Sequence, residues 1–418
     1  MRARLSPFWR AVAGLGFTQI IAWGCVYYPI SVTGPEIARD LGLSLGTVFG
    51  LYSALLLSSA CVAPAVGRLI DRSGGRPVLA AGCLVATLAL ALTAGANGVY
   101  TYAGASLLLG IAAAMTLYDA AFPALVEATG ARGRRAITLV TFAGGFASTI
   151  FWPITAVLVA YAGWRATYVV YALVMLCVCL PANWLALPHP RPAAVDDAPT
   201  LAPVATDTGG PYLQGTLRAR VLWLFAMTCA ANQIVAAAFL IHIIDFSERL
   251  GIGAREAIGL GMLFGPAQVL GRIGEMLAGA RFSAVATGRV ATAFLPLGLL
   301  FVLPQSTTLP AAIVFVLALG LSNGLMTIAR GTVALALFGP VGYGGTIGRI
   351  TVPTLLARAA GPFLFAVLLE NLGVRGTVLI GLAISACACI GMEFVASIER
   401  RVKQGATSAK PVSPDGSL

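Results

Sequence analysis

Arginines inside apolar stretches are the residues of this chain whose chemistry is most informative. Arg358 lies between Pro353 and Gly361-Pro362 in a long apolar stretch. If that stretch crosses a bilayer, an unpaired charge there is costly, so Arg358 is a candidate functional residue. A guanidinium can bind a carboxylate through two parallel hydrogen bonds. The flanking prolines favour a bent helix beside a cavity. Arg358 therefore either binds a substrate anion or forms a structural ion pair with an acidic residue.

Arg272 is the second candidate of this kind. Gln268, Arg272 and Glu275 are four and three residues apart, so they share one face of a helix. We expect Arg272 and Gln268 to contribute to substrate binding, with pairing between Arg272 and Glu275 as the alternative. The helix register stays open: Arg272 lies either at the cytoplasmic rim or nearly a turn deeper, within reach of a cavity.

A stripe of hydrogen-bonding side chains occupies the first apolar segment. Gln19, Trp23 and Tyr27 are spaced four residues apart, and Tyr28 follows directly. On a helix this spacing forms one face, and Gln19, Tyr27 and Tyr28 are candidate substrate-binding residues. The alternative is that these side chains serve in packing or as anchors at the membrane interface.

Two further ionisable residues are candidates for a charge relay. Asp119 follows Tyr118 in the fourth apolar segment and could relay a proton or pair with Arg358, with pairing or gating favoured. His242 lies near the outer end of the seventh segment with Asp245. It could titrate during transport or be a hydrated residue at the rim.

Composition indicates that lipid is the solvent for most of the chain. Of its 418 residues, 58% are hydrophobic and only 10% are charged, and the mean hydropathy is +0.89. A soluble domain carries about 25% charged residues, so this chain has too few charged residues to cover a water-exposed surface. The net charge of +11 comes from basic residues scattered between apolar stretches, which argues against a nucleic-acid surface.

Apolar stretches of about 20 residues, the length that crosses a bilayer, predict an all-α membrane protein with twelve transmembrane helices. They form two pseudo-symmetric six-helix bundles, at 8–34, 45–67, 77–95, 100–123, 136–161 and 166–187, then at 219–247, 255–280, 285–303, 309–337, 345–369 and 374–398. The expected domains are an N-terminal bundle over 1–187, a cytoplasmic linker over 188–217, a C-terminal bundle over 218–398 and a cytoplasmic tail over 399–418.

Basic residues set the expected orientation. With both termini in the cytoplasm, 18 Lys and Arg fall on the cytoplasmic side and 5 in the outer loops. This asymmetry predicts a multi-pass protein of the cell inner membrane.

Weak internal symmetry accompanies the two sets of segments. Leu41-Gly42 has a counterpart in Leu250-Gly251, Gly67-Arg68 in Gly271-Arg272, and Gly163-Trp164-Arg165 in Gly373-Val374-Arg375. The matches occur in the same order, as expected of a duplicated transporter.

One motif lies between the second and third segments. The stretch Gly67-Arg68-Leu69-Ile70-Asp71-Arg72-Ser73-Gly74-Gly75-Arg76-Pro77 resembles the G-x-L-x-D-R-x-G-x-R loop signature of the major facilitator superfamily. Gly67 permits close helix approach, and Asp71 can accept hydrogen bonds from an opposing helix N-terminus. Arg72 and Arg76 add a cytoplasmic charge cluster. The resemblance implies that this loop is a latch stabilising the outward-open state, and the alternative is a basic loop that only fixes topology.

The other charges near this motif have two interpretations. Arg330 and Arg349 flank the hairpin between the tenth and eleventh segments. They either extend to the membrane surface or act as partners of Asp71.

Departures from the drug-exporter pattern narrow the resemblance. Ser106 stands where proton-coupled drug exporters carry an Arg four residues before a Gly, here Gly110, and the G-P-x-x-G-G element is missing from the fifth segment. A cation in each of the eighth and eleventh segments resembles the oxalate/formate antiporter and monocarboxylate transporter branch. That resemblance implies that Arg272 and Arg358 bind a small carboxylate.

These features predict a secondary active transporter of a small organic anion, working by alternating access as an antiporter or a proton symporter. No ATP-binding P-loop is present, so a gradient must supply the energy. We expect no enzyme activity, no cofactor and no metal site, because the eight cysteines lie inside apolar stretches. The expected partners are the anion, a coupling ion or counter-solute and lipid, with a monomeric chain. The alternatives are an exporter of amphipathic drugs or metabolites, and a non-transporting membrane sensor.

Overall fold

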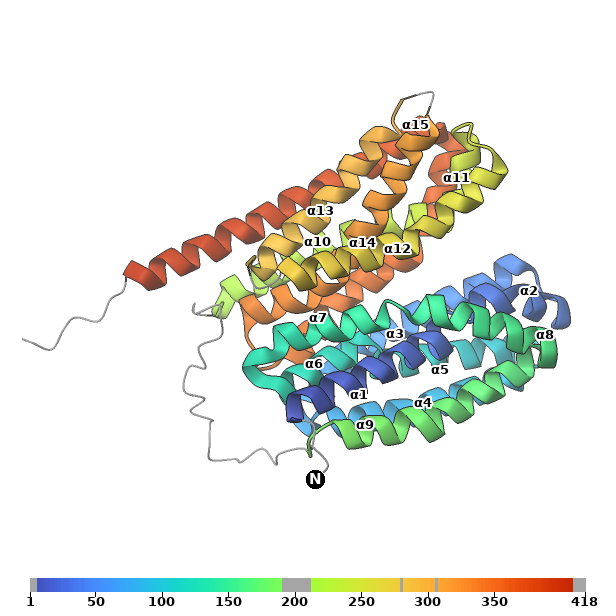
Figure 1. Cartoon of the computed structure of the whole chain (residues 1–418), viewed down its shortest axis with the longest axis horizontal. Helices are drawn as coiled ribbons and strands as arrows, with labels where there is room; N and C mark the ends of the chain where they lie inside the picture. The colour runs from blue at the N-terminus through green and yellow to red at the C-terminus, as the bar shows by residue number, and fades with distance from the viewer. Residues whose placement is uncertain (1–5, 190–211, 279–280, 305–306, 409–418) are drawn as a thin grey trace, which may run out of the picture.

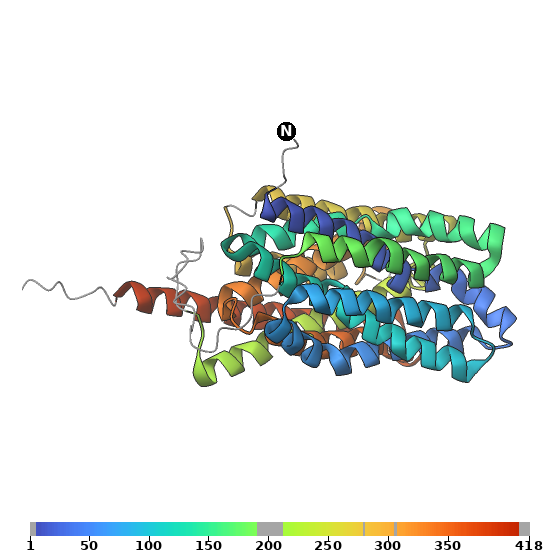
Figure 2. The same cartoon turned by 90° about the horizontal axis from the view of Figure 1, so that it is seen from below.

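Helices make up the regular structure of this chain. The computed structural model describes residues 6–189, 212–278, 281–304 and 307–408, and within these ranges it contains no strand. Figure 1 shows the helices in two bundles, one from each half of the sequence, and Figure 2 shows that they run nearly parallel along the long axis.

The N-terminal half contains nine α-helices and three short turns of other helix types within the described residues. They are α1 (Pro7–Ala22), the π-turn η1 (Trp23–Tyr27), α2 (Ile30–Asp40), α3 (Leu45–Ser73), α4 (Gly75–Ala94), α5 (Val99–Thr116), α6 (Tyr118–Thr129), η2 (Gly130–Arg132), α7 (Gly133–Gly144), α8 (Ala147–Val174), η3 (Met175–Cys179) and α9 (Leu180–Ala186).

The C-terminal half contains six α-helices in the part of the chain that the structure describes. They are α10 (Gly215–Ile241), α11 (Ile243–Arg249), α12 (Ala254–Ala278), α13 (Ala284–Phe301), α14 (Leu309–Phe338) and α15 (Tyr343–Ser408). Two of the long helices, α8 and α15, each contain a kink, at Gly163 and Gly373 respectively.

Eight stretches are long and apolar enough to cross a membrane. Two of them are 88 and 60 residues long, several times the length of about 20 residues that one crossing needs. The chain is therefore a multi-pass membrane protein. The number twelve is not confirmed by these eight stretches and stays a prediction.

Several predicted boundaries were wrong. The signature motif is helical as far as Ser73, so the turn is centred on Gly74, which has a φ of 82°. The fourth predicted segment is broken at Leu117, between α5 and α6. The last helix continues to Ser408, past the predicted end at 398. Much of the predicted linker lies outside the described residues.

The proposed internal repeat has a counterpart in the backbone. Gly42 and Gly251, which are predicted repeat partners, have φ values of 63° and 86°. Gly163 and Gly373, the second pair, have φ values of 76° and 64°. Glycine adopts this left-handed region without steric cost, so the same turns recur at matching places in both halves.

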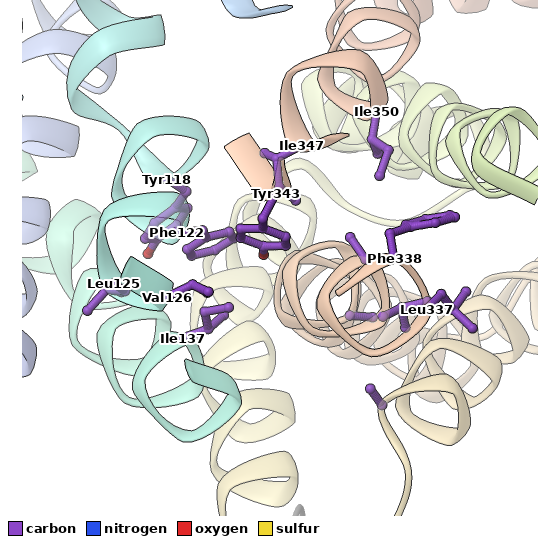
Figure 3. Close-up of a cluster of buried hydrophobic side chains, with 14 of the residues drawn as sticks. Tyr118, Phe122, Leu125, Val126, Ile137, Leu337, Phe338, Tyr343, Ile347 and Ile350 are labelled. Atoms are coloured by element: carbon purple, nitrogen blue, oxygen red, sulfur yellow. The ribbon is translucent and has the colours of Figure 1, made fainter. Parts of the chain in front are cut away.

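The packing of the core differs between the two ends of the molecule. We call the end where α1 and α10 begin and α15 finishes the terminal end, and the opposite end the distal end (Figure 1). Near the terminal end, one apolar cluster contains side chains of both halves, including Phe122 and Ile137 from one and Phe338 and Ile347 from the other (Figure 3). Toward the distal end the core divides into two clusters, of which one belongs to the C-terminal half alone. The two halves are therefore sealed together at the terminal end.

Candidate functional site

Arg358 lies in the middle of the molecule, at the inner side of α15. Its guanidinium carbon is 4.7 Å from the centre of the Tyr27 ring, so it makes a cation–π contact with the opposite half. The side chain is half-buried. Among the described residues Arg358 forms no ion pair with a carboxylate.

Arg272 belongs to α12 and is buried where this helix packs against α7. It is only 5% exposed, so it does not lie at an open rim. Its Nη1 donates to the carbonyl of Thr141 at 3.0 Å, and its Nη2 donates to Oε1 of Gln268 at 3.3 Å. Its buried Nε has no partner in the described structure. Gln268 thus supports Arg272 from the preceding helical turn.

Glu275 is not the ion-pair partner of Arg272, which corrects the alternative considered from the sequence. Its Oε1 accepts a hydrogen bond from Arg134 at 3.2 Å, and its Oε2 accepts one from Thr138 at 3.0 Å. Both partners belong to α7 of the other half. Glu275 therefore joins the two halves, and Arg272 has no carboxylate partner among the residues that the structure describes.

The π-turn η1 positions an aromatic cluster beside these arginines. The N–H of Tyr28 donates to the carbonyl of Trp23 at 3.0 Å, the five-residue bond that defines such a turn. The hydroxyl of Tyr52 donates to the Tyr27 carbonyl at 2.9 Å. The Trp23 ring packs against Tyr27 and Tyr118, each at 5.1 Å between ring centres. Because π-turns are frequent at functional sites, this one supports the location of the candidate site.

Tyr28 connects the two arginines. It lies within electrostatic range of both Arg272 and Arg358. Its ring packs at 6.1 Å against Trp152, which helps to line a groove of about 560 Å³. The groove is formed by α2 and α8, with the residues Ser31, Val32, Ser148, Thr149, Trp152, Pro153 and Ala156. The Tyr28 ring therefore lies beside this groove.

Asp119 pairs with a different arginine from the one considered from the sequence. Its Oδ1 is 2.8 Å from Nη2 of Arg330 and accepts a hydrogen bond from Thr351, also at 2.8 Å. Arg330 therefore joins Asp119 rather than Asp71. Asp119 is within electrostatic range of Arg358, but its direct ionic partner is Arg330.

The two ends of the signature motif lie in different environments, Asp71 at the start of α15 and Arg76 against Trp184. Asp71 accepts hydrogen bonds from the N–H groups of Gly344 and Gly345, at 2.8 and 2.7 Å, at the start of α15. This is the contact with an opposing helix N-terminus that the sequence predicted. A Cβ on Gly67 would overlap the backbone of Gly344, so the two helices approach closely here.

Arg72 and Arg76, the arginines at the signature positions, form no hydrogen bond with Gly344 or Gly345 in the described structure. Arg72 is exposed. Arg76 is 7% exposed and lies over the ring of Trp184, 4.1 Å from its centre.

Two other predicted residues lie away from the arginines. Gln19 is 1% exposed and donates to the carbonyl of Thr116 at 2.7 Å, so it packs α1 against α5. His242 stacks on Phe365 and hydrogen-bonds the carbonyl of Pro362 at 3.0 Å. Asp245 pairs instead with Arg249.

Sequence reasoning missed Tyr52, Thr351 and the roles of Arg134 and Thr138. These side chains contact residues that are distant in the sequence, so no spacing pattern along the chain could have predicted their contacts. Arg134 stands beside Arg135 in a basic stretch, a pattern that predicts only a cytoplasmic loop.

Comparison with known families gives the class of this protein. Residues 13–284 match the Major Facilitator Superfamily, and the chain belongs to that family. Members of the family are transporters that bind small molecules within a lipid bilayer. A comparison with curated protein sequences finds no match.

Solved structures of two transporters are similar in fold. The human organic anion transporter MFSD10 (TETRAN) has a TM-score of 0.72 and 15% identity, over 93% of this chain and 100% of that one. FucP, a Major Facilitator Superfamily transporter in the outward conformation, has a TM-score of 0.69 and 14% identity, over 93% of this chain and 99% of that one. At these identities the similarity concerns the fold alone.

Proposed function

We propose that this protein is a secondary active transporter of a small organic anion, with a carboxylate as the preferred cargo. The observation that carries the proposal is a pair of guanidinium groups, on Arg272 and Arg358, that have no carboxylate partner in the described structure. Arg272 still has a buried N–H without an acceptor.

Electrostatics explains why such a pair favours an anion. A charge in a low-dielectric interior is costly unless it is compensated. The nearby acids Asp119 and Glu275 already pair with Arg330 and Arg134. A bound carboxylate would supply the missing negative charge and accept two hydrogen bonds from one guanidinium.

The contacts between the halves fit alternating access. With twelve crossings and the termini in the cytoplasm, the terminal end is the cytoplasmic end, and its shared apolar cluster closes the route to the cytoplasm. Asp71 and Gly67 would then act as the latch of this outward-facing state. Rocking of the two bundles would open the terminal end, with exchange for another solute or co-transport of a proton as the source of energy.

Transport by reconstituted protein tests the proposal. Proteoliposomes would be screened with radiolabelled small carboxylates, and binding would be measured by thermal shift. Arg358→Gln should lower anion affinity by at least about tenfold, because it removes a charge-assisted bidentate contact. Arg375→Gln, an exposed arginine beyond the kink of the same helix, is the matched control. Full carboxylate uptake by Arg358→Gln would refute the anion assignment.

The aromatic cluster favours a second candidate, an exporter of amphipathic compounds. Trp23, Tyr28 and Trp152 could stack on a planar ligand. This function predicts that Arg358→Gln still transports amphipathic dyes while Trp152→Ala does not. Ligand binding without flux in any of these assays would instead indicate a sensor.

A further inference from the structure

Arg76, in the first turn of α4, is a buried cation without a counter-ion among the described residues. It is 7% exposed, its Nε has no hydrogen-bond partner, and it forms no ion pair in the described part of the chain. The nearby carboxylate of Glu127 is engaged by the backbone N–H of Gly75 at 2.6 Å. The only described contact of the Arg76 guanidinium is with the face of Trp184.

An apolar groove begins directly beside this arginine. Its volume is about 610 Å³, and it lies between the first turns of α4 and the helix α9. Its lining contains no charged residue and consists of Pro77, Ala80, Ala81, Leu84, Leu180, Pro181, Trp184 and Leu185. Pro77 follows Arg76 in the sequence, and Trp184 is the ring under the guanidinium. The cation therefore marks one end of the groove.

The groove faces the lipid rather than the interface between the halves. Its lining includes Leu84, which is 52% exposed, and Leu185, which is 71% exposed. In a multi-pass membrane protein, exposed leucines of this kind contact acyl chains. The four groove residues of α4 lie within the eight residues from Pro77 to Leu84, or about 10 Å of helix. That length accommodates part of an acyl chain.

We propose that this groove binds one anionic phospholipid, with an acyl chain along α4 and α9 and the phosphate on Arg76. The guanidinium fork matches a phosphate geometrically. Trp184 fits the interface level of a bilayer, where tryptophan is enriched. With the terminal end in the cytoplasm, Arg76 lies in the leaflet where anionic lipids concentrate. The groove is separate from the arginines of the proposed transport site.

Native mass spectrometry of the purified full-length protein tests this site. The probes are phosphatidylglycerol, phosphatidylcholine and the soluble headgroup analogue glycerol 1-phosphate. The wild type should bind one phosphatidylglycerol about five- to tenfold more tightly than phosphatidylcholine, the effect of one basic residue near a headgroup. Arg76→Gln should remove this preference and keep the binding of phosphatidylcholine.

Two further variants keep the test decisive. Ala81→Leu fills the groove without changing its charge and should weaken both lipids equally, which still tests the groove if Arg76→Gln does not fold. Arg132→Gln is the matched control, because Arg132 also lies over an aromatic ring, Phe8 at 4.3 Å, at the same end of the molecule.

Three outcomes would overturn the proposal. They are equal binding of both lipids by the wild type, an equal loss of the preference in Arg132→Gln, and full displacement of phosphatidylglycerol by an equal concentration of glycerol 1-phosphate. The last outcome would assign Arg76 to a soluble phosphate compound.

Discussion

The two halves share a fold but contribute opposite chemistry to their interface. The N-terminal half mainly supplies electron-rich groups: the carboxylates of Asp71 and Asp119, the carbonyl of Thr141 and the ring of Tyr27. The C-terminal half supplies the cations and N–H donors that face them, from Gly344, Gly345, Arg330, Arg272 and Arg358.

Glu275 reverses this pattern. This carboxylate of the C-terminal half accepts from Arg134 and Thr138 of the N-terminal half. Glycines with positive φ recur at matching places in both halves. Most of the charged residues, in contrast, do not recur at matching places. The turns thus recur in both halves while the charges differ, and Arg272 and Arg358 have no carboxylate partner among the described residues.

The largest loss of stability should come from breaking the ion pair between Asp119 and Arg330, which joins the two halves. Both side chains are at most 15% exposed. Arg330→Gln leaves a buried carboxylate unpaired, which should destabilise the protein by about 3 kcal/mol, measured as a lower midpoint of thermal denaturation.

The double variant Asp119→Asn/Arg330→Gln should lose less stability than the two single variants together, because the double variant leaves no unpaired charge behind. Additive losses would show that the pair does not couple the two halves.

A smaller effect should follow from Gly67→Val. The added side chain would overlap the backbone of Gly344, and such overpacking costs about 2 kcal/mol. We expect the terminal end to open, measured as faster thiol labelling of a cysteine introduced at Ile347, which is buried at the interface. Gly50→Val is the matched control, because a Cβ there meets no atom within 4 Å. Equal labelling of both variants would contradict this role for Gly67.

The smallest effect should come from Tyr52→Phe. It removes the hydrogen bond to the Tyr27 carbonyl, worth about 1 kcal/mol, so the Tyr27 ring under Arg358 loses one of its supports. The KM for the anion should rise about fivefold at unchanged kcat. Tyr100→Phe, at an 89% exposed tyrosine, should leave both constants unchanged. A fall in kcat alone would place Tyr52 in the conformational step.

Local features of the fold and the site could be predicted from the sequence. The apolar segments and the hydrogen bonds of Asp71 follow from residue types over short spacings, whereas the sequence left open whether Arg358 pairs with an acid. The repeat partners Gly42 and Gly251 were identified in the same way, since a left-handed turn needs a glycine.

The ion pairs across the interface could not be predicted. Arg330 with Asp119 and Arg134 with Glu275 join helices of different halves, and their pairing depends on how the bundles are rotated against each other. The break at Leu117, which divides α5 from α6, was also missed, because no glycine or proline stands at Thr116, Leu117 or Tyr118 to mark it.

The π-turn at Trp23–Tyr27 has a consequence for variation in the first helix. It accommodates one residue more than an α-helical turn would. Deleting a single residue there would restore ordinary winding and leave the helix beyond it close to its present orientation, because five residues of a π-turn and four of an α-helix both complete about one turn. The extra residue therefore changes only the local positions of the aromatic side chains beside Arg358, while Gln19 before the turn keeps its place.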